Sequence, residues 1–467
     1  MHRRIASICA GSALLTASAL AAAGTAAAAA PAALTGAGPV PLARMLSHVS
    51  FPTPPTTAQC EQQLGVACYA PFQYHKAYNL GPLYKKGLNG KGQTIVIVDS
   101  FGYQFIRGEL AVFDKSFGLP APPSFKIIRP AGPVPSYNPK LRPMMVGWAQ
   151  ETSLDVEYSH AMAPGANILL VETPVPETLG VHGLPQIVQA ENFVINHHLG
   201  SVITQSFGAP EAGFPNAQSI LALRSAYKNA AAHGVSVLAA SGDGGATGPN
   251  SLTKQGFAKT FFLHRTVDWP ATDPLVTAVG GTQMHLTATG AHTQPDTVWN
   301  DTNLFDSPAA SSGGLSTVFG RPAYQNGVAD TVGGRRGVPD ISMSAAVDGA
   351  ALVYLDAKAA QGPAGFYLIG GTSEASPLMS GVVAIADQLA GHGLGLLNPA
   401  LYKMEAAGDP GLVDVTAGTN TVTFPQGGSV HSVRGFDAVK GYDLSSGLGT
   451  IDAAQFVPEL VAATGSG

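Results

Sequence analysis

Charged residues are scarce in this sequence, and neither sign dominates. Asp, Glu, Lys and Arg make up 12% of the 467 residues, and the formal net charge is −5. A protein that binds nucleic acid through its phosphates needs a surplus of Lys and Arg, so we expect no nucleic-acid partner. Hydrophobic residues make up 45% of the chain. That share excludes a chain that stays disordered because it has too little apolar surface to bury.

Cysteine is also rare, with only three in the chain. This number excludes a disulfide-rich scaffold and a zinc site built from four cysteines. Cys9 lies in the N-terminal segment described next, which leaves Cys60 and Cys68. In an oxidising compartment such a pair forms a disulfide by default, so we predict the bond Cys60–Cys68. A catalytic thiol is the weaker alternative, because no redox motif surrounds either cysteine.

Long apolar runs are absent except near the N-terminus. Two arginines, Arg3 and Arg4, precede an apolar and small-residue run that begins at Ile5. This is the layout of a secretory signal peptide. A retained membrane anchor is the alternative, but the run is rich in Ala, Ser and Gly and poor in Leu. We therefore expect residues 1–30 to be a cleaved signal peptide, and the protein to be secreted, extracellular and free of the membrane afterwards.

The next segment, residues 31–68, is rich in Ala, Pro and Thr and has no hydrophobic periodicity. We expect it to be a linker or a remnant pro-segment. Residues 69–467 have a different sequence pattern, because short β-branched runs alternate there with helical stretches. We expect them to form one domain.

Five of these runs have the length and composition of buried strands. They are Thr94–Asp99, Ile168–Glu172, Ser201–Thr204, Val235–Ala239 and Leu275–Val279. Between the third and the fourth, Asn216–His233 has apolar residues at helical spacing, with Asn216 as N-cap and Gly234 as C-cap. The alternation predicts an α/β fold with a mostly parallel sheet flanked by helices.

Three clusters of residues could carry chemistry. The first is GGTSEASP at Gly370–Pro377, where Ser373 would stand at the start of a buried helix. The backbone N–H groups and the dipole at such a helix end favour a developing negative charge. Taken alone, the cluster would favour a Ser/Thr cap on a core helix.

The second cluster is ETSLD, which places Glu151 and Asp155 on one helical face. If this face points inward, the two carboxyl groups can share a proton and supply the base that a serine nucleophile needs. The common alternative is a solvated surface helix. The third cluster is SGDGG at Ser241–Gly245, which places Asp243 directly after a predicted strand. Asp243 could be a turn residue, a metal ligand or a catalytic group.

Together with the segments around them, these clusters resemble the sedolisin family of serine-carboxyl peptidases, which are secreted endopeptidases and tripeptidyl peptidases. The resemblance extends from about Tyr69 to Asp452. Besides the three clusters, the matching segments are SFG at Ser206–Gly208, PATDPLVTAVGGT at Pro270–Thr282, SSGGLS at Ser311–Ser316 and VPDIS at Val338–Ser342.

The resemblance implies a subtilisin-like fold in a single catalytic domain. It makes Ser373 the nucleophile, Glu151 its general base and Asp155 the residue that orients Glu151. Asp243 would serve the oxyanion hole, where a carboxyl group can donate a hydrogen bond only while protonated. The expected activity is therefore hydrolysis of protein or peptide substrates at acidic pH. We also expect the protein to be a monomer. Family members usually carry a large folded pro-domain, whereas here only residues 31–68 separate the expected signal peptide from the matched region.

Two rival interpretations remain open at this point. One is a subtilisin-type Ser-His-Asp protease that uses Asp99, His160 and Ser373 in that chain order. His160 lacks the flanking glycines of subtilisins, which favours a packed helix histidine. The other rival is a non-catalytic binding protein on the same fold.

The resemblance also implies a calcium site near the C-terminus. It assigns the side chains of Asp414 and Asp443 and the main-chain carbonyls of Val415, Val439 and Gly441 as ligands. Oxygen ligands from flexible loops suit Ca²⁺. Asp437 is a competing ligand whose spacing does not match the family, and the alternative without a metal is that Asp414 and Asp443 only cap turns.

Overall fold

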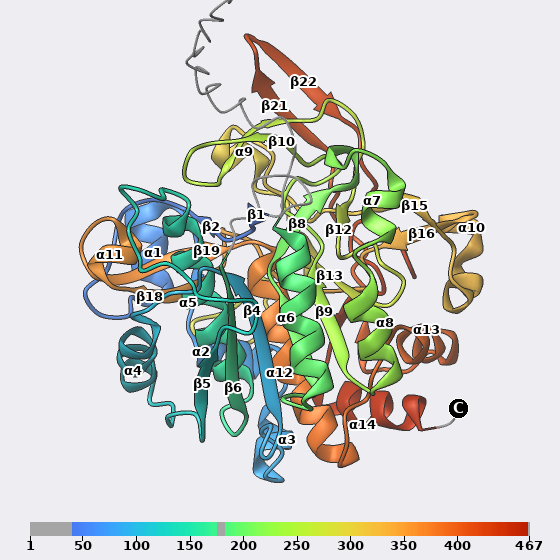
Figure 1. The fold of residues 1–467 in the computed structure, drawn as a ribbon, viewed down its shortest axis with the longest axis horizontal. Coiled ribbons are helices and arrows are strands. Elements are labelled where there is room, and N and C mark those ends of the chain that lie inside the picture. The colour runs from blue at the N-terminus through green and yellow to red at the C-terminus, as the bar shows by residue number, and fades with distance from the viewer. Residues whose placement is uncertain (1–39, 175–182, 466–467) are drawn as a thin grey trace, which may run out of the picture. The chain divides into compact units, whose positions relative to one another are not determined.

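A β-sheet of eight strands forms the framework of the computed structural model, which describes residues 40–174 and 183–465 (Figure 1). Seven strands follow the order β14-β13-β9-β7-β4-β6-β5, and β17 also pairs with β13. Their bounds are β4 Thr94–Ser100, β5 Phe125–Ile128, β6 Asn167–Thr173, β7 Val202–Gln205, β9 Ser236–Ala240, β13 Thr277–Gln283, β14 Thr297–Val298 and β17 Ile341–Ser344. All neighbours pair in parallel except β13 and β14, as the sequence predicts for an α/β fold.

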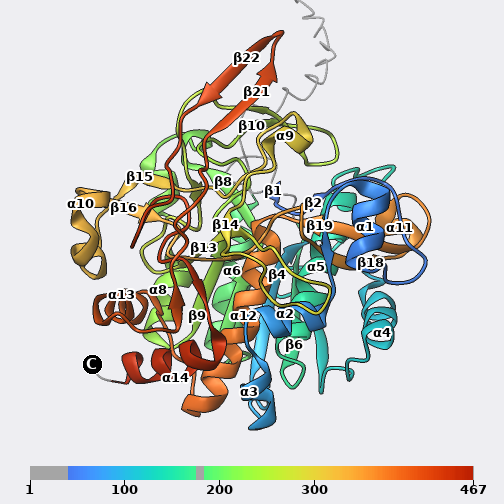
Figure 2. The ribbon, with the colours of Figure 1, turned by 180° about the vertical axis from the view of Figure 1, so that it is seen from behind.

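Helices cover both faces of this sheet. In β4, Ile95 and Ile97 join one buried apolar cluster, whereas Val96 and Val98 join a second. Successive side chains of a strand point to opposite faces, so the sheet has a core on each side. The first core packs against α5 Met145–Met162, α12 Thr372–Ala390 and α14 Ala453–Thr464, and the second against α6 Leu184–Asn196 and α8 Ser225–Ala232 (Figures 1 and 2).

The remaining elements are short and surround this framework. The helices are α1 Thr57–Leu64, α2 Pro71–Ala77, α3 Gly81–Lys85, α4 Ile106–Phe117, α7 Ala217–Leu221, α9 Thr302–Phe305, α10 Ala329–Val332, α11 Ala357–Ala360 and α13 Asn398–Ala407. The strands are β1 Val40–Pro41, β2 Arg44–Met45, β3 Cys68–Tyr69, β8 Phe207–Pro210, β10 Pro249–Leu252, β11 Ala258–Phe261, β12 Asp268–Trp269, β15 Gly314–Gly320, β16 Arg335–Val338, β18 Ala350–Leu355, β19 Gly365–Gly370, β20 Leu412–Val413, β21 Val422–Gln426, β22 Ser429–Val433 and β23 Thr450–Ile451. Within the described ranges, no helix is both long and apolar enough to cross a membrane.

All five predicted strands are present, with ends that shift by a few residues. The single helix predicted over Asn216–His233 is wrong, because the structure has two helices, α7 and α8, with a turn between them. Asn216 caps the first helix by accepting from the Ser219 N–H. The turn coincides with Arg224, whose guanidinium makes a bidentate ion pair with Asp273, a contact that helical periodicity cannot show.

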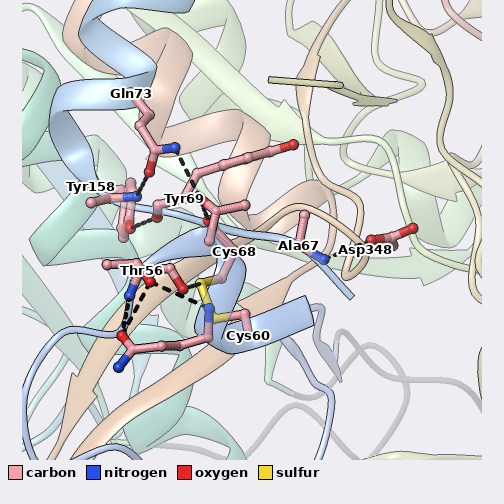
Figure 3. Close-up of a disulfide and its surroundings, with 11 residues drawn as sticks. Thr56, Cys60, Ala67, Cys68, Tyr69, Gln73, Tyr158 and Asp348 are labelled. Atoms are coloured by element: carbon pink, nitrogen blue, oxygen red, sulfur yellow. Dashed lines mark hydrogen bonds between the residues drawn. A yellow bond between two sulfur atoms is a disulfide. The ribbon is translucent and has the colours of Figure 1, made fainter. Parts of the chain in front are cut away.

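Residues 40–68 do not behave as an unstructured linker. They contain β1, β2 and α1 and end at β3, which pairs in parallel with β18. The predicted disulfide Cys60–Cys68 joins α1 to β3, and both cysteines are buried (Figure 3). Periodicity is absent from the sequence here because the elements are too short to display it. The expected signal peptide, residues 1–30, lies outside the described residues, and a remnant pro-segment stays a prediction.

Candidate active site

Ser373 is the second residue of α12, as the sequence predicts. Strand β19 ends at Gly370, Gly371 makes the turn, and the helix begins at Thr372. Gly371 has a φ of 110°, and a side chain there would collide with the carbonyl oxygen of Leu42 and approach the carboxyl group of Asp243. The backbone N–H groups of the first helical turn have no partner within the helix, so Ser373 stands where a negative charge is stabilised.

Glu151 and Asp155 lie one turn apart on α5, and both are fully buried. Helix α5 packs against α12, so the two carboxyl groups point into the molecule and not to solvent. Burial raises the pKa of Glu151 well above its usual value, while the hydroxyl of Ser373 lowers it. Oε2 of Glu151 accepts a hydrogen bond from the Ala43 N–H at 2.7 Å.

A third carboxyl group, from Asp99 at the end of β4, belongs to the same cluster. Burial raises the pKa of Asp99 to about 7, and a hydrogen bond with Asp155 lowers it. The pKa of Asp155 is raised well above its usual value, first by burial and then by the charges of Asp99 and Glu151. Ser206 also donates to Asp155 Oδ1 at 2.6 Å. Three buried carboxyl groups whose charges interact in this way cannot all be ionised, so they hold protons between them.

Asp243 follows β9 and is 2% exposed. Its Oδ1 accepts from the N–H and the hydroxyl of Thr372, both at 2.8 Å, which brings it to the start of α12. Burial raises the pKa of Asp243 to about 6, and the positive charge of Arg44 opposes this shift. The Arg44 guanidinium lies 3.4 Å from Asp243 Oδ2. A pKa of about 6 lets this carboxyl group carry a proton under mildly acidic conditions.

The structure does not assemble the rival Asp99, His160 and Ser373 set. His160 Nε2 contacts the Pro120 carbonyl at 2.7 Å and lies 3.4 Å from Asp114. Burial lowers the pKa of His160 to about 4, which keeps the ring neutral. His160 is therefore a packed helix histidine, and Asp99 interacts with Asp155 and not with His160.

Sequence reasoning missed some residues of this site. Ser206 and Thr372 lie inside matched segments, so a signal for them existed, although no role was assigned to them. The contact of Asp99 with Asp155 had no local signal. The placement of Ala43 and Arg44 had no local signal either, because residues 31–68 have no hydrophobic periodicity.

The predicted calcium ligands come together only in part. Asp414 Oδ2 accepts from the Gly441 N–H at 2.8 Å, and Asp443 Oδ2 accepts from the Val439 N–H at 3.1 Å. Both carboxylates therefore contact the loop that carries Val439 and Gly441, and all the predicted donor atoms are the oxygens that Ca²⁺ prefers. Asp443 Oδ1 also accepts from the N–H groups of Ser445 and Ser446, which is turn capping. No cluster of three or more His, Cys, Asp or Glu side chains suited to a metal occurs in the described part of the chain.

The main chain of Asp437, the competing candidate, pairs with a residue outside the predicted ligand set. It is exposed and forms a β-bridge with Thr419.

Comparison with known proteins places this site in a family. The family model described as the subtilase family matches residues 145–404. Among curated relatives, kumamolisin from a Bacillus species is 30% identical over 83% of this chain and 63% of its own length. Sedolisin from a Pseudomonas species is 34% identical over 58% of this chain and 42% of its own length. Human tripeptidyl-peptidase 1 is 30% identical over 64% of this chain and 50% of its own length.

A solved structure agrees with these matches. Pseudomonas sedolisin, a serine-carboxyl proteinase complexed with two molecules of pseudo-iodotyrostatin, covers 85% of this chain with a TM-score of 0.67 and 25% identity, over 99% of its own chain. The chain therefore belongs to the subtilase family. Within it, the matches confirm the resemblance to the sedolisins and their subtilisin-like fold. The chain spans between 42% and 63% of the length of these three curated relatives.

Proposed function

We propose that this protein is a serine-type peptidase of the serine-carboxyl class, which hydrolyses peptide bonds at acidic pH through an acyl-enzyme on Ser373. The observation that carries the proposal is the meeting of three groups at one place. Ser373 at the start of α12 interacts with the buried base Glu151, and Asp243 binds the turn that precedes Ser373. A nucleophile, a base and an oxyanion donor are the parts that acyl transfer needs.

Glu151 acts as the general base in this proposal. In the present arrangement Ser373 Oγ donates to the Ser206 carbonyl at 3.3 Å, and Glu151 Oε1 has no hydrogen-bond partner at normal distance. A rotation of the serine hydroxyl toward Glu151 would complete the catalytic pair, and such bonds are often loose before substrate binds. Asp155 then keeps a proton, orients Glu151 and leaves the negative charge on the base.

Asp243 stabilises the oxyanion that forms when Ser373 attacks a substrate carbonyl. Only its protonated form can donate a hydrogen bond. Since burial raises the pKa of Asp243 to about 6, the required proton is present below that pH and lost above it. This supports activity in acid.

Two substitutions test the proposal. Ser373→Ala removes the nucleophile and Glu151→Gln removes the base, so both variants should lose peptide hydrolysis while keeping their melting temperature. Ser376→Ala is the matched control, because Ser376 lies one turn further along α12 and bonds only to Thr204 at 2.8 Å. The control should keep its activity. Turnover near that of the wild type in either test variant would reject the assignment and favour a non-catalytic binding protein.

We also propose a calcium ion at Asp414, Val415, Val439, Gly441 and Asp443. The ion would hold the two carboxylates and the loop carbonyls together and stabilise the folded state by mass action. Metal analysis of the purified protein should find calcium, and a chelator at neutral pH should lower the melting temperature. Asp414→Asn, which removes one charged ligand, should reduce the effect of the chelator. An unchanged melting temperature with no calcium in the protein would reject the site.

Export and a monomeric state complete the proposal. The N-terminal segment supports secretion, and size-exclusion chromatography with light scattering would measure the mass in solution. The protein in the culture medium should lack residues 1–30.

A further inference from the structure

Two histidines lie at the ends of neighbouring helices, where the chain turns back into the sheet. Helix α6 ends at Asn196, and His198 follows it before β7. Helix α8 ends at Ala232, and His233 follows it before β9. The two helices lie side by side, and β7 pairs in parallel with β9 (Figures 1 and 2). The same position in two helix–strand units therefore carries a histidine.

Side-chain hydrogen bonds fix the two helix ends relative to each other. Asn229 on α8 donates to Asn192 Oδ1 at 2.9 Å and to Asn196 Oδ1 at 2.8 Å, both on α6. The imidazole rings of His198 and His233 have centres 6.0 Å apart, and their planes are tilted by 54°. Both side chains are exposed, so a solute can reach them. The spacing of the two rings is therefore set by the packing of α6 against α8.

His198 adopts an uncommon backbone conformation. Its φ is 52°, in the left-handed region, where the residue after a helix is usually Gly and sometimes Asn. Its N–H donates to the Ile195 carbonyl at 3.0 Å and closes the last turn of α6. A residue with a Cβ is strained in this conformation. Because residues held in strained conformations cluster at functional sites, His198 is a candidate for a function of its own.

The ring of His233 is oriented as a metal ligand. Its Nδ1 lies 2.9 Å from the Asn229 carbonyl oxygen. A carbonyl oxygen can only accept, so the proton is on Nδ1 and the lone pair of the neutral ring is on Nε2. Metal-binding histidines are held in this way, by a hydrogen bond from the ring nitrogen that does not bind the ion. His233 therefore offers Nε2 as a ligand atom.

The surroundings of the two rings also favour a cation. A cavity of about 270 Å³ lies beside them, lined by both histidines and by residues that include Gly92, Gly200 and Gly234. Among the described residues that line this cavity, none is Lys or Arg. The last carbonyl groups of α6 and α8 carry partial negative charge, which attracts a positive ion. A cation bound here would therefore meet two ligands and a favourable field.

The separation of the rings fits one shared ion. An imidazole nitrogen binds a metal such as Zn²⁺ at about 2.0–2.1 Å, which puts the ion about 3.2 Å from the ring centre. Two rings on one ion can therefore have centres up to about 6.4 Å apart, and the observed 6.0 Å lies within this limit. Imidazole suits Cu²⁺, Ni²⁺ and Zn²⁺, and the general order of affinity places Cu²⁺ first.

We propose that His198 and His233 form a two-histidine site for a divalent transition-metal ion, with Cu²⁺ bound most tightly and water completing its coordination. The site lies at the starts of β7 and β9, whereas Ser206 and Asp243 follow the ends of these strands. The starts and ends of parallel strands lie at opposite edges of a sheet, so the ion does not touch the candidate active site. The site also uses no residue of the proposed calcium site, and it stands independently of the peptidase function.

Calorimetric titration of the full chain with Cu²⁺ tests the site. The parent protein carries Ser373→Ala, so that it cannot digest itself, and excess Ca²⁺ keeps the proposed calcium ligands occupied. The titration is run at pH 7.5, because protons compete with the metal for the imidazole nitrogens. We expect a melting temperature that rises with the concentration of Cu²⁺, because the ion binds only the folded pair of rings. Electron paramagnetic resonance should show two nitrogen ligands on the bound Cu²⁺.

Three single substitutions separate this pair of histidines from its neighbour. His198→Asn introduces a residue that tolerates the left-handed conformation, and His233→Gln keeps a polar side chain, so both variants should fold. Loss of a residue that only orients a ligand costs about 10–100-fold in metal affinity, so each variant should bind Cu²⁺ at least about tenfold more weakly. His197→Gln is the matched control, because the His197 ring stacks on Phe193 with centres 4.0 Å apart. The control should keep the parent's affinity.

The outcomes separate this inference from the proposed function. A parent whose melting temperature does not respond to Cu²⁺, or variants at His198 and His233 that bind Cu²⁺ as tightly as the parent, would overturn the site. An equal loss of affinity in the His197→Gln control would also overturn it, because the ion would then use a different histidine. Melting temperatures without metal are the folding control. Peptide hydrolysis should be unchanged when His198→Asn is placed in the wild type, and a wild type without hydrolysis would reject only the peptidase function.

Discussion

Asp243 shows at the scale of a single residue how burial changes the use of a side chain. In water an aspartic acid is ionised near neutral pH and can only accept hydrogen bonds. Here burial raises its pKa to about 6 in spite of the nearby Arg44 charge. The residue can therefore act as a donor in mild acid.

Replacing Asp243 with Asn is expected to impair catalysis, because the protonated carboxyl group would supply one oxyanion donor. Loss of one such donor lowers turnover by about 10²–10³. An amide donates at every pH, so the variant should lose less activity toward neutral pH than in acid. The measurement is kcat against pH on a peptide substrate, with melting temperature as the folding control. Unchanged kinetics throughout the acid range would show that Asp243 is only a turn residue.

At the scale of elements, two helices and one covalent link position the site. Helix α5 carries Glu151 and Asp155 and packs against α12, which carries Ser373. Helix α1 and strand β3 follow Ala43 and Arg44, which contact Glu151 and Asp243, and the disulfide Cys60–Cys68 joins α1 to β3. The disulfide therefore fixes the part of the chain that follows residues 40–46.

Removal of this disulfide tests its share of the stability. A Cys60→Ala, Cys68→Ala double variant should lose about 2–3 kcal/mol of unfolding free energy, because the bond closes a short loop in the unfolded chain. Urea unfolding measures the change as a lower midpoint. Reduced wild-type protein should match the variant. An oxidised wild type whose midpoint equals that of the double variant would contradict the prediction.

At the scale of the whole molecule, buried carboxyl groups are numerous outside the active site as well. Burial raises the pKa of Glu109, Glu191 and Glu374 to about 8 and of Asp387 to about 7. Each of these groups binds its proton more tightly in the folded state than in the unfolded chain, where its pKa is about 4. Folding is therefore favoured at low pH, and this contribution is lost as the pH rises from about 4 to 8.

The folded protein should accordingly be more stable at pH 5 than at pH 8. Melting temperatures of the Ser373→Ala variant, measured with a chelator present, exclude self-digestion and metal binding. Glu374→Gln in that background should weaken the pH dependence, because the amide keeps the contact with Tyr74 and cannot ionise. A melting temperature that rises from pH 5 to pH 8 would contradict the prediction.

The sequence by itself determined the parts of the site that depend on local order. A spacing of four residues puts Glu151 and Asp155 on one face wherever that helix lies. The glycines and small residues before Ser373 place it at a helix start, and a buried run before Asp243 places it at a strand end. Short-range rules of periodicity and capping decide these features, so they were predictable and the structure agrees.

Only the tertiary structure decided which distant groups meet. Ala43 and Glu151 are 108 residues apart, and Arg44 and Asp243 are 199 apart. Their contacts depend on how residues 40–46 pack against the elements that carry Glu151 and Asp243, and no local pattern encodes that packing. The same reason explains why His160 faces Pro120 and Asp99 faces Asp155. Burial, which sets the pKa values of these groups, is likewise a property of the folded molecule alone.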